Sequence, residues 1–159
     1  MKKLLLTLLT ALMLNSAWAG PEADAATAMA RQDFATVLKI VRPLALKGEA
    51  WAQFALGHAY MQGEGVLQDY AEAVKWYRLA AQQGSSWAQN ELGLAYVDSK
   101  GVAQDYVKAH NWFNLGAISG HVFAVNNRDK VAKRMTPQQI AEAQKLARDC
   151  QARNFKGCD

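Results

Sequence analysis

Few residues of this chain could do chemistry, and their spacing forms no catalytic motif. The three histidines are His58, His110 and His121, which form neither a His-x-x-x-His pair nor a His/Cys cluster, so no metal site is predicted. No serine stands in a Gly-x-Ser-x-Gly turn. No Lys-Ser/Thr pair follows residues 63–65 at the spacing of a phosphate-binding loop. We therefore predict no cofactor and no enzyme activity.

The two cysteines, Cys150 and Cys158, are the remaining reactive groups. A lone cysteine pair in an exported chain is expected to form a disulfide. Closing so short a loop stabilises the fold by about 2.5 kcal/mol in the chain-entropy estimate. Such a bond would hold a C-terminal tail that otherwise frays. The alternative, a redox or catalytic thiol pair, lacks the Cys-x-x-Cys spacing.

The first nineteen residues have the pattern of an export signal. Two lysines precede an apolar run over residues 4–14, and Ala17 and Ala19 are the small residues expected before a cleavage site at Gly20. The run is shorter than the roughly 20 residues that span a bilayer. An uncleaved N-terminal anchor is the alternative. We predict a mature chain, residues 20–159, that is periplasmic or secreted and has no stable membrane insertion.

Charge gives a weaker signal. The net charge is +4, which is too little excess to predict nucleic acid as a partner of an exported chain. From Arg128 onward, however, eight basic residues stand against four acidic ones. This segment could attract an acidic partner or an anionic membrane surface. Alternatively, it is the polar outer face that an end repeat needs.

The elements that must position these residues follow from a repeat. Two stretches of the chain share one pattern, thirty-six residues apart, with no gap between the copies. A fixed period of roughly 20–50 residues is typical of stacked helical repeats, which present a surface rather than enclose a pocket. The shared residues of the first copy are Trp51, Ala52, Gln53, Leu56, Gly57, Ala59, Tyr60, Gly65, Val66, Gln68, Asp69, Tyr70, Ala73, Trp76, Leu79, Ala81 and Gly84.

Each copy predicts two helices. Residues 50–61 have apolar side chains at helical spacing, and Asp69 is a natural N-cap for a second helix over residues 70–83. Gly84 then ends that helix in the left-handed conformation. Gly57 falls in mid-helix, where glycine costs roughly 1 kcal/mol relative to alanine. We therefore expect a close helix crossing at this position.

The same period extends outward to two atypical ends. Before the clear copies it predicts helices over residues 22–31 and 33–47, with Pro43 weakening the second. After them it predicts a helix from His121 and a last helix over residues 137–152, capped by Thr136. Repeats are expected at residues 22–48, 49–84, 85–120 and 121–159, within one domain from residue 20.

The pattern resembles the Sel-1-like repeat (SLR) family. Residues 50–84 meet that family's motif almost in full, and residues 88–120 depart from it at Ser99 and Gly116. The resemblance implies an all-α, right-handed solenoid of antiparallel helix pairs, related to the tetratricopeptide fold, with the first helix of each pair on the concave face. Cysteine-rich secreted members carry a cysteine pair at the same spacing as this chain.

Three aromatic residues stand where the SLR motif is variable. Trp51, Trp87 and Phe123 are spaced by thirty-six and would form a ladder of exposed rings along the solenoid. The alternative is that each ring packs its helix start against the preceding helix. In contrast, Trp76 and Trp112 match the core tryptophan of the motif.

The sequence thus predicts an exported, non-enzymatic scaffold that binds an unknown protein or peptide. The resemblance also suggests one alternative: binding or hydrolysis of penicillin-type or cell-wall compounds, for which no Ser-x-x-Lys motif is present. A third possibility is a purely structural role, such as that of an assembly factor in the envelope. The predicted partner-binding residues are Trp51, His58, Met61, Trp87, Leu94 and Phe123.

Overall fold

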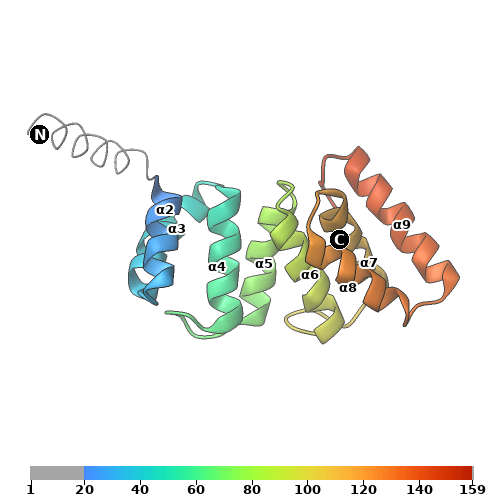
Figure 1. Cartoon of the computed structure of the whole chain (residues 1–159), viewed down its shortest axis with the longest axis horizontal. Helices are drawn as coiled ribbons and strands as arrows, with labels where there is room; N and C mark the ends of the chain where they lie inside the picture. Colours follow the sequence, from blue (N-terminus) through green and yellow to red (C-terminus); the bar gives the residue numbers. More distant parts are fainter. Residues whose placement is uncertain (1–19, 159) are drawn as a thin grey trace, which may run out of the picture.

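A computed structural model describes residues 20–158, and this part of the chain contains eight α-helices and no strand (Figure 1). The all-α prediction is therefore confirmed. Successive helices lie side by side in a row, so the molecule is elongated (Figure 1). The helices are α2 (Pro21–Ala30), α3 (Phe34–Leu46), α4 (Ala50–Gln62), α5 (Tyr70–Ala81), α6 (Ser86–Asp98), α7 (Tyr106–Ile118), α8 (Val122–Ala132) and α9 (Pro137–Ala152).

Local capping explains where the helices begin and end. The Asp69 carboxylate accepts a hydrogen bond from the Glu72 backbone N–H, and Asp105 does the same for Lys108. Thr136 forms a full capping box with Gln139. After α5, Gly84 takes the predicted left-handed conformation, with φ +86°. Helix α3 continues through Pro43 to Leu46.

The mid-helix glycines mark close helix crossings, as expected. A Cβ atom added to Gly57 would lie 2.7 Å from Cδ1 of Tyr77 on α5. A Cβ atom at Gly93 would collide with the Phe113 ring on α7. Because an aromatic ring fills each space, the helices of each regular pair can approach closely only if glycine stands at the crossing.

The apolar side chains form two core clusters along the row. The larger extends from Met61 of α4 through α5 to α9 to Cys158 of the tail, and it encloses Trp112, of which 1% is exposed. The smaller joins α2, α3 and α4, and Trp76 packs against it while half-buried. The prediction that both tryptophans serve packing is therefore confirmed, although Trp76 is the more exposed.

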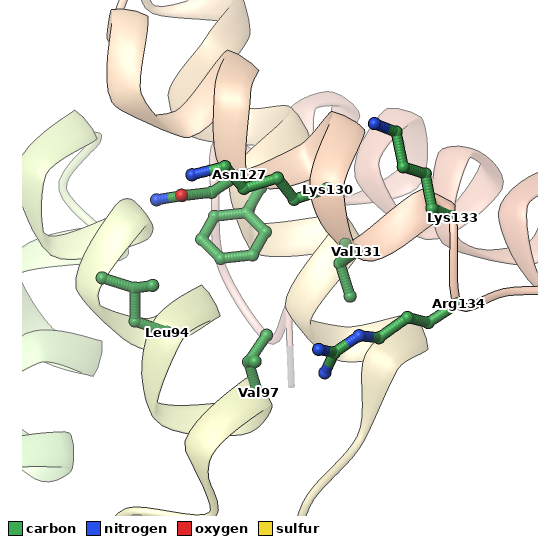
Figure 2. A pocket seen from close by; sticks show the side chains of 8 residues that line it. Leu94, Val97, Asn127, Lys130, Val131, Lys133 and Arg134 are labelled. Carbon is green, nitrogen blue, oxygen red and sulfur yellow. The ribbon is translucent and has the colours of Figure 1, made fainter.

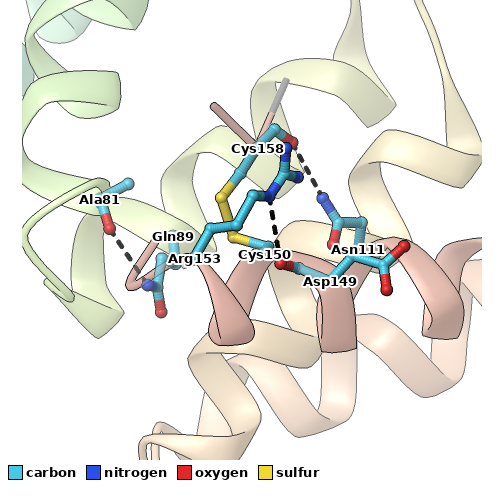
Figure 3. The surroundings of a disulfide bond; sticks show 7 residues. All are labelled: Ala81, Gln89, Asn111, Asp149, Cys150, Arg153 and Cys158. Atoms are coloured by element: carbon cyan, nitrogen blue, oxygen red, sulfur yellow. Dashed lines mark hydrogen bonds between the residues drawn. A yellow bond between two sulfur atoms is a disulfide. The ribbon is translucent and has the colours of Figure 1, made fainter. Parts of the chain in front are cut away.

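A repeated spacing of eight residues ties the first helix pair to the second and the second to the third. Gln53 donates a side-chain hydrogen bond to the carbonyl of Ala45 at 3.3 Å, and Gln89 donates one to the carbonyl of Ala81 at 3.2 Å. At the C-terminal end the same spacing is occupied by a disulfide between Cys150 and Cys158 (Figure 3). The predicted bond is thus present, and it stands where earlier junctions use a buried amide.

The disulfide holds a tail that folds back over the helices. Asn111 on α7 donates a hydrogen bond to the carbonyl of Cys158 at 3.3 Å (Figure 3). Phe155 reaches the turn after α5, where its ring would lie 3.5 Å from a Cβ atom at Gly84. The tail therefore contacts two earlier elements of the chain, as a staple would require.

The last helix pair differs from the regular ones. Helix α9 packs on α7 rather than on α8, whereas α4 packs on α5 and α6 on α7. Its buried side chains, Ala143, Ala147 and Cys150, are small and follow one narrow stripe. Because that stripe faces α7, one side of α8 is left without a helix against it.

The export signal falls outside the described residues. Within residues 20–158, every helix is too short or too polar to cross a membrane.

Candidate functional site

A continuous row of rings joins the first helices of three successive pairs. We call Phe54, His58, Trp87, His121 and Phe123 the aromatic row. The ring centroids of Phe54 and His58 lie 6.5 Å apart, and those of Phe54 and Trp87 lie 6.4 Å apart. Trp87 meets His121 edge to face at 4.4 Å, and His121 lies 5.9 Å from Phe123. These spacings are those of interacting rings.

The row is largely uncovered at its C-terminal end. Trp87 is 55% exposed and Phe123 is 62% exposed, which is unusual for rings of this size. Trp51 stands at the equivalent position but is half-buried against the N-terminal core cluster. Thus Trp87 and Phe123 are exposed, as the predicted ladder of rings requires. Trp51 instead packs against the preceding helices, as the alternative interpretation states.

An apolar groove of about 590 Å³ continues the row toward the N-terminus. Helix α4 lines it with Trp51, Phe54 and His58, and α6 contributes Trp87. Helix α2 contributes Met29 and Glu22 to the same groove. The groove and the exposed rings together form one apolar surface that extends from α2 to α8.

His121 links the aromatic row to the start of α8. Its Nδ1 accepts a hydrogen bond from the Ala124 backbone N–H at 3.2 Å, which makes it the N-cap of the helix. Only 7% of the residue is exposed, and burial lowers the pKa of the imidazole below its usual value. A neutral ring fits this place, since protonation would remove the acceptor and put a positive charge at a helix N-terminus.

Two carboxylates lie beside the row. His58 Nδ1 lies 3.3 Å from Oε2 of Glu64, and Glu91 accepts a hydrogen bond from Asn90 at 3.1 Å. Burial raises the pKa of the Glu91 carboxyl, with Asn90 and His58 acting in the opposite direction. These groups could receive a polar atom of a bound partner next to the apolar surface.

The other predicted site residues lie apart from the row. Met61 is 7% exposed and packs in the core, so in this conformation it offers almost no contact surface. Leu94 is partly exposed and lines a separate hollow between α6 and α8. His110, outside the predicted set, is buried at 3% exposure.

The structure also adds residues that sequence reasoning missed. Phe54 and His121 connect the predicted aromatic positions into one row, but neither repeats a residue of the neighbouring copies. The sequence signal that could have identified them is their closeness to the predicted residues: Phe54 follows Trp51 by three residues, and His121 precedes Phe123 by two. Among residues 20–158, no group of three or more His, Cys, Asp or Glu side chains could hold a metal ion.

Stacked helix pairs with an uncovered aromatic row define a helical-repeat protein of the solenoid class. Residues 52–85 and 88–121 each match the Sel1 repeat family. The chain therefore contains two Sel1 repeats. The matched segments are the two copies that share the period of thirty-six residues. No curated protein matches the sequence.

Two solved structures share the fold. One is a protective antigen present in uropathogenic Escherichia coli strains and displays an SLR fold; it is 32% identical, with a TM-score of 0.78 over 88% of this chain and 32% of that one. The other is a Sel1 repeat protein from Oxalobacter formigenes, 27% identical, with a TM-score of 0.60 over 63% of this chain and 40% of that one. The chain thus spans less than half the length of either.

Proposed function

We propose that this protein is an exported, non-enzymatic scaffold that binds a protein segment along the aromatic row. The observation that carries the proposal is the exposure of Trp87 and Phe123, at 55% and 62%. Large rings left in water by a folded chain gain free energy when a partner covers them. Aromatic side chains are also the residues in which binding energy concentrates at protein interfaces.

The shape of the surface supports a segment rather than a small molecule. The groove beside Trp51 and Phe54 is open, and the row continues past it to Phe123 on α8. A small ligand is usually enclosed over most of its surface, whereas an extended or helical segment lies along a groove. The proposed partner therefore has several apolar side chains spaced along one face.

Site-specific crosslinking tests this proposal directly. A photoreactive amino acid at position 87 should crosslink a defined protein in the native cell, and one at Leu67 should not. Leu67 is a matched control, because it is apolar and 91% exposed but lies in the loop before α5. The captured protein should bind purified Trp87→Ala and Phe123→Ala variants at least about tenfold more weakly, as truncation of central aromatic residues typically does.

Thermal melts separate contact from folding. Both variants should keep their unfolding free energy within about 0.5 kcal/mol, because surface substitutions rarely cost more. A captured partner that binds the Trp87→Ala and Leu67→Ala variants equally well would contradict the proposal. A collapse of the melt in Trp87→Ala would make the ring a packing residue instead.

Export forms the second half of the proposal. It rests on the sequence of residues 1–19 and on the disulfide, which is typical of oxidising compartments. Likeness to a protective antigen is compatible with a location outside the cytoplasm. N-terminal sequencing of the mature protein from a periplasmic or culture fraction should begin at Gly20. Recovery of the uncleaved chain from the cytoplasm would refute export.

The non-enzymatic part has its own assay. Purified protein should leave the chromogenic cephalosporin nitrocefin unhydrolysed, since the sequence offers no Ser-x-x-Lys nucleophile. Steady hydrolysis by the wild type, absent from a mock purification of cells that lack the protein, would show the enzyme alternative to be right.

A further inference from the structure

A second hollow lies between α6 and α8, apart from the aromatic row. Its volume is about 420 Å³, within the range of roughly 300–1,000 Å³ typical of binding pockets. We call it the basic pocket. It is lined by four apolar residues, one amide and three cations: Leu94, Val97, Phe113, Val131, Asn127, Lys130, Lys133 and Arg134 (Figure 2).

The apolar side of the pocket is open to solvent. Leu94 and Val97 extend from α6 toward Val131 of α8, and both α6 residues remain partly exposed (Figure 2). The pocket lies between α6 and α8, which pack only lightly against each other, and no residue of α9 lines it. An apolar side chain of a partner could therefore enter without displacing any described element.

The charge around the pocket is uncompensated. Residues 122–135 contain four cations and one acid, Asp129. That acid is paired with Arg128, whose Nη2 lies 3.0 Å from Oδ1 of Asp129. The three remaining cations all line the pocket, where none has an ion pair among the described residues. No acidic residue lines it.

One of the three cations is held in place. Arg134 donates a hydrogen bond from Nη1 to the hydroxyl of Tyr106 at 3.3 Å, and its guanidinium lies 5.9 Å from the centre of that ring. A neutral phenol positions the guanidinium without neutralising it. An anion meeting this group would therefore not have to order a free side chain, which lowers the entropic cost of binding.

We propose that the basic pocket binds a protein segment in which an apolar side chain is flanked by carboxylates. The apolar side chain covers Leu94 and Val97, and the carboxylates face Lys130, Lys133 and Arg134. Complementary charge of this kind supplies specificity and speeds association, while the apolar contact supplies affinity. The site shares no residue with the aromatic row, so it does not depend on the function proposed above.

Binding of short peptides tests the proposal. The probe is a fluorescently labelled, end-blocked peptide of sequence Asp-Glu-Leu-Phe-Glu-Asp, titrated with the full mature protein and followed by anisotropy. Two matched peptides replace either the acids by Asn and Gln or the apolar pair by Ser. Only the first peptide should bind, and its affinity should fall between low salt and about 0.5 M salt, because the charged contacts are exposed and screened.

Variants locate the binding. Lys130→Gln with Lys133→Gln should weaken binding of the acidic peptide about five- to tenfold, the effect of losing two exposed charge contacts. Lys39→Gln with Lys47→Gln makes the same charge change on and beside α3. It should alter the affinity less than about twofold, because neither lysine lines the pocket and α3 packs on α2 and α4. Leu94→Ala should also weaken binding of the acidic peptide. A thermal melt of this variant, measured in parallel, checks that it remains folded.

Several outcomes would overturn the proposal. One is the absence of binding at millimolar peptide. Another is an equal loss of peptide affinity in the Lys130/Lys133 and Lys39/Lys47 double variants. Equal binding of the neutral peptide would remove the role of the cations. Vesicles of phosphatidylglycerol provide the remaining comparison: binding to them that needs Lys130 and Lys133, with the acidic peptide inactive, would make the site a membrane contact instead.

Discussion

At the residue scale, the mid-helix glycines decide how closely the helices pack. We expect Gly93→Ala to destabilise the fold by about 1–3 kcal/mol, because overpacking against Phe113 exceeds the roughly 1 kcal/mol gained in helix propensity. Gly57→Ala should behave alike through Tyr77. Gly116→Ala is the milder comparison, since its Cβ atom would lie 3.0 Å from that of Ala124. Urea unfolding measures all three, and a stabilised Gly93→Ala variant would contradict the crossing argument.

A second prediction at this scale concerns His121. Because burial lowers its pKa in the folded state, the unfolded chain takes up the proton first as the pH falls below about 6.5. The stabilising contribution of His121 is therefore present at neutral pH and lost on acidification. His121→Ser keeps an N-cap acceptor but does not titrate. The unfolding free energy of the wild type relative to this variant should fall between pH 7 and pH 5.

His110 stays unchanged in both proteins, so its own pKa, lowered by burial and then by Arg128, cancels in the comparison. A difference between wild type and His121→Ser that is constant over this pH range would show that His121 does not couple folding to pH.

At the element scale, the junctions between helix pairs explain what sequence could and could not predict. Caps, breaking glycines and the period are local or repeated signals, so the bounds of α4 to α7 followed closely from the sequence. The exposure of the aromatic positions did not follow, because Trp51 and Trp87 are equivalent in the period but meet different neighbours. The basic pocket was also missed, since it depends on how α6, α7 and α8 pack against one another.

The junctions also yield a direct exchange experiment. Replacing Cys150 and Cys158 by alanine should cost about 2.5 kcal/mol, the chain-entropy estimate for so short a loop. Cys150→Ala with Cys158→Gln recreates the residues of the Ala81–Gln89 junction, whose amide donates to the Ala81 carbonyl. This variant should recover about 1 kcal/mol, the usual net value of a hydrogen bond. Denaturant unfolding of both variants provides the test.

Reduction of the wild type is the control for this exchange. A reducing agent should lower the stability of the wild type alone, because neither variant contains a cysteine pair. If the glutamine variant is no more stable than the alanine variant, the disulfide and the buried amide are not equivalent parts of the junction.

At the scale of the whole molecule, stability should vary along the row of helices. Each pair of a solenoid contacts only its neighbours, so its ends lack one partner. Helix α2 buries only Ala25 and Ala28, and α8 only Ala124 and Val131, whereas α6 and α7 each bury seven residues. Amide protection from hydrogen exchange should therefore be highest in α4 to α7 and lower in α2, α8 and α9.

The disulfide makes this prediction sharper. Reducing it should raise exchange in α9 and in α7, on which α9 packs, and change α4 least, because α4 packs mainly on α3 and α5. Exchange measured by mass spectrometry on the oxidised and reduced protein separates these regions. Uniform loss of protection in every helix would instead show that the chain unfolds as one cooperative unit. In that case the aromatic row and the basic pocket would be coupled through the core rather than independent.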